Sequence, residues 1–316
     1  MVRLIALAVL AGAPAFAQTP RGTPVISHHY AKVNGVTLHY AEAGRGEPII
    51  FLHGFPEFWY AWKDQLAEFG RDHRAIAPDM RGYNLSDRPA AVEQYTIPIL
   101  IEDIRQLAES LGVKKFTLVA HDWGGALAWV FALRYPEYVK KLVIINAPHP
   151  FVFRRELANN PAQQKASQYM LFFRSAQAES GLSANNYQGL VNGVLGSGLK
   201  SGAFTEADKA EYIKAWSQPG ALTGGLNYYR AARVGPPTPD APVPAALLPG
   251  PETQITVPTL VIWGEKDEAL LTGNLEGLDA YVTHLTVKRI PEGSHWVVHE
   301  QGPLVNRLIR EFVTSP

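Results

Sequence analysis

The chain contains no cysteine, and it carries no formal net charge because 29 Lys and Arg residues balance 29 Asp and Glu residues. Without cysteine the protein can form neither disulfide bonds nor thiolate metal sites, and it has no cysteine nucleophile. A net charge of zero argues against binding to nucleic acid or to an anionic membrane through bulk charge. The hydrophobic fraction is 47%, which is typical of a globular protein with a sizeable core.

Residues 1–17 form a segment that we expect to lie outside the fold. Arg3 provides a short positive region, an apolar stretch begins at Leu4, and Ala15-Phe16-Ala17 supplies small residues around a cleavage point before Gln18. This order is that of a secretory signal peptide, and it predicts an exported chain that is periplasmic or secreted after cleavage near Ala17. The stretch is too short to span a bilayer comfortably, so no stable membrane insertion is expected. An uncleaved anchor and a buried strand are the alternatives.

Short apolar runs alternate with helical patterns along the rest of the chain. The runs cover residues 48–52, 74–78, 116–119, 141–145, 259–263 and 285–289, and helical patterns cover residues 99–111 and 126–134. Strands that alternate with helices form a mostly parallel sheet covered by helices on both faces. The sequence therefore predicts an α/β fold, with its site at the carboxyl ends of the strands, where ligands bind in open sheets.

The strand pattern stops between residues 148 and 233, where helical periodicity and many aromatic side chains take over. We predict that this segment is a helical cap inserted over the strand ends. Residues 234–253 are rich in proline and glycine and are predicted to form a semi-rigid connection back to the sheet. The predicted core is then made of residues 18–147 and 254–316.

The most informative motif is Ala120-His121-Asp122-Trp123-Gly124-Gly125, which lies between an apolar run and a helical pattern. A buried strand, a tight turn with glycines and a helix make a nucleophile elbow, which holds one side chain exposed above the sheet. Asp122 takes the position that serine takes in most elbows. A carboxylate that attacks saturated carbon leaves an ester that water can cleave, whereas serine would leave an ether. Asp122 therefore favours an epoxide or a carbon–halogen bond as the electrophile; a turn aspartate that caps the helix is the alternative.

His53-Gly54-Phe55-Pro56 follows the run at residues 48–52. In α/β-hydrolases a loop at this point donates one backbone N–H to the oxyanion hole, and the residue after the nucleophile donates another. The predicted oxyanion donors are therefore the N–H groups of Phe55 and Trp123. A simple proline turn is the alternative interpretation of the loop. His121, which precedes the nucleophile, is expected to support the elbow by hydrogen bonding.

Two further loops supply candidates for the rest of a catalytic triad. Asp267 follows the run at residues 259–263, and His295 follows the last run. The order Asp122, Asp267, His295 is the nucleophile–acid–histidine order of α/β-hydrolases. Glu265 and Glu268 are weaker candidates for the acid. No histidine–carboxylate set has convincing metal spacing, so neither a metal nor a cofactor is expected.

With these motifs the chain resembles the epoxide hydrolases of the α/β-hydrolase superfamily, from about Ile26 to the C-terminus. The resemblance is carried by His53-Gly54-Phe55-Pro56-Glu57, Asp79-Met80-Arg81-Gly82-Tyr83, His121-Asp122-Trp123-Gly124-Gly125, Asn146-Ala147-Pro148-His149-Pro150, Gly264-Glu265-Lys266-Asp267 and Ser294-His295-Trp296. It implies a covalent alkyl ester on Asp122, a vicinal diol as product and no cofactor. Some relatives carry the triad acid at the position of Asn146, so an amide there favours Asp267.

The resemblance also assigns a role to two tyrosines of the cap. Tyr169 and Tyr229 match the family's ring-opening tyrosines, whose phenols would donate hydrogen bonds to the epoxide oxygen. Amphipathic packing is the alternative role for both. Tyr228 competes with Tyr229, because a one-residue error exchanges them. The aromatic cap favours an apolar small-molecule epoxide as substrate.

Two other functions compete with this one. A haloalkane or haloacid dehalogenase would use the same nucleophile, but it needs a halide cradle in place of two phenols. Trp123 offers one halide donor, yet Phe55 stands where haloalkane dehalogenases usually have a polar or charged residue. Fluoroacetate dehalogenases usually have arginine where this chain has Trp123. A secreted binding protein on a hydrolase scaffold is the third hypothesis, which loss of a triad member would have supported. The sequence gives no oligomeric state.

Overall fold

The computed structural model describes residues 24–243 and 249–315, so the expected signal peptide at residues 1–17 lies outside the described residues. Within the described residues, eight strands form one sheet in the order β1-β2-β4-β3-β5-β6-β7-β8. Neighbouring strands from β4 to β8 run parallel, whereas β2 is antiparallel to β1 and β4. The strands are β1 (Ser27–Val33), β2 (Val36–Ala43), β3 (Pro48–Leu52), β4 (Arg74–Pro78), β5 (Phe116–His121), β6 (Val139–Ile145), β7 (Thr259–Gly264) and β8 (Leu285–Ile290). The predicted, mostly parallel sheet is confirmed.

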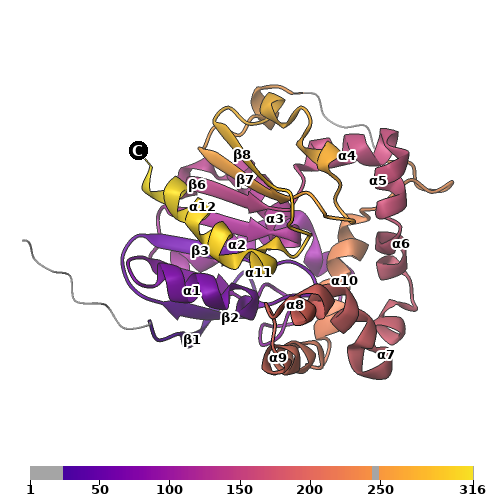
Figure 1. Cartoon of the computed structure of the whole chain (residues 1–316), viewed down its shortest axis with the longest axis horizontal. Coiled ribbons are helices and arrows are strands. Elements are labelled where there is room, and N and C mark those ends of the chain that lie inside the picture. Colours follow the sequence, from indigo (N-terminus) through magenta and orange to yellow (C-terminus); the bar gives the residue numbers. More distant parts are fainter. Residues whose placement is uncertain (1–23, 244–248, 316) are drawn as a thin grey trace, which may run out of the picture.

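Helices cover both faces of the sheet (Figure 1). One core layer lies under α2 (Ile97–Ser110) and α3 (Asp122–Arg134), and the other lies under α1 (Lys63–Phe69) and α12 (Gly302–Thr314). Alternate residues of a central strand enter the two layers, so that Ile50 packs in the first and Ile49 in the second. Because both faces of these strands are buried, their sequences are continuous apolar runs.

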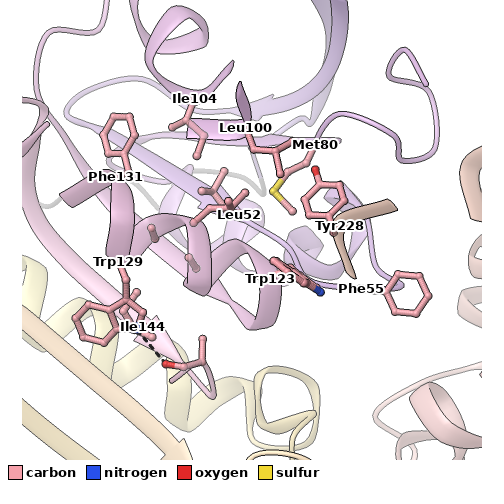
Figure 2. Packing of buried hydrophobic residues seen from close by; sticks show 14 of the residues in the cluster. Leu52, Phe55, Met80, Leu100, Ile104, Trp123, Trp129, Phe131, Ile144 and Tyr228 are labelled. Carbon is pink, nitrogen blue, oxygen red and sulfur yellow. Dashed lines mark hydrogen bonds between the residues drawn. The ribbon is translucent and has the colours of Figure 1, made fainter. Parts of the chain in front are cut away.

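The layer under α2 and α3 fixes the helix that begins at the nucleophile elbow. Leu52, Phe131 and Ile144 pack together there (Figure 2). Trp129 is almost fully buried among them, and its indole N–H donates a hydrogen bond to the backbone oxygen of Ala147 at 3.0 Å. Burying one large apolar side chain contributes about 1.5–3 kcal/mol. The packing of α3 therefore holds its first turn firmly against the strand ends.

The structure adds two strands, β1 and β2, that the apolar runs do not predict. β1 is mostly exposed, so it has no apolar run to detect. Asn34 and Gly35 join the two strands in a tight turn, with φ angles of +47° and +77°. An Asn-Gly pair between two strands is the strongest short-range hairpin signal, because both turn positions need positive φ. The sequence contains this signal, Asn34-Gly35, on the N-terminal side of the first predicted strand at residues 48–52.

Between β6 and β7 the chain leaves the sheet and forms helices over one end of it, at the right of Figure 1. These helices, residues 150–232, are called the cap below. They are α4 (Pro150–Asn159), α5 (Pro161–Ala166), α6 (Tyr169–Arg174), α7 (Ala178–Leu190), α8 (Gly196–Ser201), α9 (Glu206–Trp216) and α10 (Ala221–Ala232), with the π-helical turn η4 (Val191–Leu195) before α8. The Tyr228 phenol donates to the Arg81 backbone oxygen at 2.9 Å, and the Trp216 indole donates to that of Pro56 at 2.6 Å. These bonds fasten the cap to the core.

Shorter elements complete the fold. α11 (Val297–Glu300) precedes α12, and 3-10 helices occupy Trp59–Trp62, Val92–Tyr95, Pro136–Tyr138, Pro251–Thr253, Thr272–Leu275 and Leu278–Ala280. Among the described residues, no helix combines the length and the apolar character that crossing a membrane requires.

Candidate active site

The carboxyl ends of the parallel strands bring the three expected triad residues together. Asp122 follows β5, Asp267 follows β7 and His295 follows β8. His295 Nδ1 lies 2.7 Å from Asp267 Oδ2, and His295 Nε2 lies 3.6 Å from Asp122 Oδ2. The imidazole ring therefore directs one nitrogen at each carboxylate. Glu265, a weaker candidate for the acid, pairs with Arg289 instead.

Asp122 lies in a strained turn between β5 and α3. Its φ is +49°, in the left-handed region that costs an L-residue roughly 1–2 kcal/mol. The helix and the neighbouring loop approach closely, because a Cβ at Gly124 would meet the Leu52 backbone oxygen at 2.4 Å. A Cβ at Gly54 would meet Asp122 Cβ at 2.3 Å. Glycine at both positions lets the turn hold the carboxylate above the sheet, which is the geometry of a nucleophile elbow.

Asp267 is buried, and several donors fix its carboxylate. Oδ1 accepts hydrogen bonds from the backbone N–H groups of Ala269 and Leu270, both at 2.8 Å. Oδ2 accepts from the side-chain amide of Asn146 at 2.8 Å, in addition to its contact with His295. Donors of this kind favour the ionised carboxylate. They also fix the oxygen that orients the imidazole.

The three groups shift one another's pKa values. Burial would raise the pKa of Asp122, but the hydrogen bond and charge of His295 outweigh it and hold the pKa below its usual value. Burial also opposes the shift at Asp267, where the charge and hydrogen bond of His295 lower the pKa. Burial would lower the pKa of His295, yet the two carboxylates raise it well above its usual value. In the free site these shifts favour an imidazolium between two carboxylates.

A backbone donor already contacts the expected nucleophile. The N–H of Phe55 donates a hydrogen bond to Asp122 Oδ1 at 2.8 Å. Trp123, the second expected donor, lies in the first turn of α3, where N–H groups have no carbonyl partner within the helix. Oδ1 is thus the oxygen that contacts the Phe55 N–H, whereas Oδ2 is the oxygen nearer to His295.

Tyr169, at the start of α6, and Tyr229, in α10, line a cavity of about 850 Å³ whose wall includes Asp122 and His295. The centroids of the two phenol rings are 6.4 Å apart. Burial raises the pKa of both phenols well above the usual value, and the charge of Asp122 raises it further. Both phenols are therefore protonated at neutral pH and can donate hydrogen bonds. The phenol of Tyr228, the competing candidate, instead donates its hydrogen bond to the Arg81 backbone oxygen in the core.

Aromatic rings form much of the cavity wall. The rings of Phe55, Phe173 and Tyr229 contact one another: the centroid of Phe173 is 5.1 Å from each of the other two, which are 5.5 Å apart. Phe173 also contacts the ring of Tyr169, at 5.2 Å between centroids. A cavity of this size and lining suits a small ligand with an apolar body. Charged lining residues come from the core: Lys266, Glu268, Glu292 and Glu300.

A second buried network lies next to the elbow, and of its members the sequence motifs assign a role to His121 alone. Glu57 is 1% exposed, and its carboxylate lies 3.2 Å from His121 Nδ1, 2.6 Å from His299 Nε2 and 3.1 Å from the Tyr212 phenol oxygen. Burial would raise the pKa of Glu57, but the charges and hydrogen bonds of the two histidines hold it far below its usual value. His121 Nε2 also lies 2.9 Å from the backbone oxygen of His295. His121 thus joins the residue before Asp122 to the loop that carries His295.

In the part of the chain that the structure describes, no three His, Asp or Glu side chains are grouped so that they could hold a metal ion.

Residues 47–301 match a family described as the alpha/beta hydrolase fold. Epoxide hydrolase 4 of Mus musculus is 39% identical over 297 residues, which are 91% of this chain and 79% of the mouse protein. The AB hydrolase superfamily protein YfhM of Bacillus subtilis is 40% identical over 290 residues, which are 90% of this chain and 97% of that protein. The chain belongs to the epoxide hydrolase family of the α/β-hydrolase superfamily.

A solved structure of the epoxide hydrolase family has the same architecture. Bacillus megaterium epoxide hydrolase in complex with an inhibitor has a TM-score of 0.85 and 41% identity, over 91% of this chain and 100% of that chain. The α/β-hydrolase fold predicted from the motifs is thereby confirmed.

Proposed function

We propose that the chain opens an apolar epoxide to a vicinal diol through a covalent alkyl ester on Asp122. The observation that carries this proposal is the cavity in which the Asp122 carboxylate shares a wall with the phenols of Tyr169 and Tyr229. The family relatives support it. A variant of Bacillus megaterium epoxide hydrolase, 41% identical to this chain, was solved in complex with its product, (R)-3-[1]naphthyloxy-propane-1,2-diol, which is itself a vicinal diol.

In the first step an oxygen of Asp122 attacks an epoxide carbon. Oδ1 accepts the Phe55 N–H, so Oδ2 is the oxygen that we assign as the attacking atom. A carbon–oxygen bond forms to Oδ2, the ring carbon–oxygen bond breaks, and its electron pair stays on the ring oxygen. Tyr169 and Tyr229 donate hydrogen bonds to that oxygen, and one of them transfers its proton. The product is a hydroxyalkyl ester of Asp122.

Ester formation changes the charge around His295. The negative charge of Asp122 helps to raise the pKa of His295 in the free site. The ester carries no charge, so the pKa of His295 falls and the imidazolium can release its proton, which re-protonates the tyrosine phenolate left by ring opening. A neutral imidazole is the form that can act as a general base. Alkylation thus prepares the base that the next step needs.

In the second step His295 removes a proton from water, and the hydroxide oxygen attacks the ester carbonyl carbon. Asp267 stabilises the imidazolium that forms. Negative charge develops on Oδ1, where each backbone donor of an oxyanion hole is typically worth about 3–4 kcal/mol. The tetrahedral intermediate then expels the diol oxygen, which takes the proton from His295 and leaves Asp122 as a carboxylic acid. Asp122 passes that proton to His295, whose Nε2 lies 3.6 Å from Oδ2, and this restores the carboxylate and the imidazolium of the free site.

Trapping the ester tests this proposal. His295→Gln keeps the nucleophile and both phenols but removes the base, so incubation with an epoxide should leave one substrate mass on the peptide that contains Asp122. The matched control is Asp122→Asn in the same background, which should carry no adduct. An adduct on another peptide, or none with any epoxide that the wild-type chain converts, would contradict the covalent mechanism.

The competing functions lack a comparable observation. A dehalogenase needs a halide cradle, whereas the groups that face Asp122 across this cavity include two protonated phenols. A binding protein needs no triad, and the three triad residues lie together here.

We also propose that the chain is exported and cleaved near Ala17. The support is the order of Arg3, the apolar stretch from Leu4 and the small residues Ala15 and Ala17. The mature enzyme would then act in the periplasm or outside the cell.

A further inference from the structure

The loop that carries His295 is held by a carboxylate five residues further along the chain. Glu300 Oε2 accepts a hydrogen bond from the Ser294 backbone N–H at 2.9 Å, and Oε1 accepts one from the Ser294 hydroxyl at 2.9 Å. The Ser294 hydroxyl oxygen accepts the Trp296 backbone N–H at 3.1 Å. Glu300 therefore fixes the backbone on both sides of the catalytic-site histidine.

The same carboxylate also binds the cap. The Ser197 hydroxyl of α8 donates a hydrogen bond to Glu300 Oε1 at 2.7 Å. Close by in sequence, the carbonyl oxygen of Gly193 in η4 accepts the indole N–H of Trp296 at 2.9 Å. Both contacts join residues 191–201 of the cap to the loop around His295. Figure 1 shows α8 and α11 side by side, which agrees with these contacts.

Residues 191–201 form one side of the substrate cavity. Within this segment Asn192, Gly193, Val194, Ser197 and Ser201 line the cavity, and Ser294, His295, Trp296 and Glu300 of the core line it as well. The contacts of Ser197 and Gly193 thus lie where the two sides of the cavity meet.

The chain that leads into this segment is strained. Asn185, Asn186 and Tyr187 have φ angles of +50°, +55° and +62°, inside the span assigned to α7. Asparagine tolerates left-handed backbone, but tyrosine adopts it only at a cost in free energy, so the conformation of Tyr187 persists only where the surrounding structure holds it. The π-helical turn η4 follows directly. The backbone of the cap therefore adopts an unfavourable conformation just before residues 191–201, the segment that Ser197 binds to Glu300.

We propose that Glu300 is a positioning residue that couples closure of residues 191–201 over the cavity to the alignment of His295. Ser197 is the residue of the cap that contacts Glu300 in the closed arrangement. This inference rests on the function proposed above. When the segment is closed, the Ser197 hydroxyl restrains the carboxylate that fixes the His295 loop. When it is open, that restraint is lost. Asp122 stands on the elbow between β5 and α3, so its position does not depend on this contact.

The coupling predicts unequal effects on the two chemical steps. Ser197→Ala removes the cap contact and leaves the hydrogen bonds from Ser294 to Glu300 in place. We expect hydrolysis of the ester to slow by about three- to tenfold, the size of one hydrogen bond to a charged group at a partly exposed site. Alkylation of Asp122 should stay within about twofold of the wild-type rate, because His295 takes no proton in that step. Ser197→Thr keeps the hydroxyl and should restore hydrolysis.

Ser217→Ala is the matched control. Ser217 caps the end of α9 and does not line the cavity, and its hydroxyl donates to the Ile213 backbone oxygen within its own helix, at 2.7 Å. Its loss should change neither step. A double-mutant cycle isolates the contact: in a Glu300→Gln background, Ser197→Ala should have a smaller effect than in the wild-type chain. Melting temperatures of all variants establish that each one is folded.

Single-turnover kinetics with a converted epoxide measures both steps, with tryptophan fluorescence reporting alkylation. Equal slowing of alkylation and hydrolysis by Ser197→Ala, no slowing at all, or full additivity with Glu300→Gln would each overturn the coupling while leaving the ester mechanism intact. A wild-type chain that forms no ester on Asp122 would instead overturn the proposed function, and the coupling with it.

Discussion

The side-chain amide of Asn146 donates a hydrogen bond to Asp267 Oδ2 at 2.8 Å, from the end of the strand next to the one that carries the acid. The same carboxylate oxygen lies 2.7 Å from His295 Nδ1. The amide of Asn146 and the imidazole of His295 therefore contact the same carboxylate oxygen, Asp267 Oδ2. An amide can do this without charge, whereas a second carboxylate at this place would repel the first.

Exchanging the two residue types tests whether the acid can move to the neighbouring strand. Asp267→Asn should slow ester hydrolysis by about 10²-fold or more, because the imidazolium loses its charged partner. Adding Asn146→Asp should recover at least about tenfold of that loss, since it returns a carboxylate to the same pair. Aspartate also tolerates the φ of +39° at this position better than alanine would. Single-turnover hydrolysis rates decide the matter, and a double variant no faster than Asp267→Asn alone would show that only residue 267 can serve.

The strand ends are the part of the site that sequence patterns predict well. Buried parallel strands give continuous apolar runs, so the residues that follow them, Asp122, Asp267 and His295, can be placed at one edge of the sheet. The one-residue ambiguity between Tyr228 and Tyr229 could not be resolved in this way. Both lie in α10, and only packing against the core determines which phenol enters the cavity.

Contacts between distant parts of the chain are the part that sequence patterns do not predict. Glu57 and His299 are 242 positions apart, yet their side chains lie 2.6 Å from each other. No periodicity links two such positions, and a lone buried glutamate is unfavourable until its partners are known. The exposed strand β1 was missed for a different reason, because a solvent-facing edge strand has no apolar run.

The two cap tyrosines separate an epoxide hydrolase from a dehalogenase. Ring opening produces an alkoxide, which needs a proton, whereas halide departure needs none. Tyr169→Phe or Tyr229→Phe should each slow alkylation of Asp122 by about 10²-fold, because a donor to a developing charge is lost. The double variant should nearly abolish epoxide opening. Tryptophan fluorescence in the pre-steady state can follow the step, since Trp123 packs against the Tyr229 ring with centroids 5.1 Å apart.

Tyr228→Phe is the control for these variants. Its phenol donates to the Arg81 backbone oxygen and does not line the cavity. Removing it should lower the free energy of unfolding by about 1–3 kcal/mol, the cost of a buried acceptor left without its donor. Alkylation should be nearly unchanged. If the double variant of Tyr169 and Tyr229 alkylates at the wild-type rate, those phenols are packing residues and the dehalogenase hypothesis gains support.

Export can be tested at the N-terminus. Protein recovered from the native host, or from a bacterial periplasm, should begin at Gln18 or within one or two residues of it. N-terminal sequencing or intact mass measures this directly. Changing Ala15 and Ala17 to bulky residues should block cleavage, because the site requires small side chains. Soluble, active protein that retains Met1 in the native host would refute the proposal.

The pH dependence of the two steps should differ, because each uses a different protonation state. The lowered pKa of Asp122 keeps the nucleophile ionised, and the raised pKa values of both phenols keep the donors protonated. Alkylation should therefore be flat through the neutral range and fall only in acid, as Asp122 takes up a proton. Hydrolysis needs neutral His295, whose pKa is raised by two carboxylates in the free site and by one in the ester. Its rate should rise with pH and level off above the pKa of His295 in the ester. Stopped-flow measurements of both steps from about pH 5 to 10 provide the test.

Removing the Asp267 charge should move the rise in the hydrolysis rate to lower pH, because the remaining carboxylate that raises the pKa of His295 is then lost. An alkylation rate that follows the same rising curve as hydrolysis would mean that neutral His295 is required in both steps, contrary to the roles assigned here.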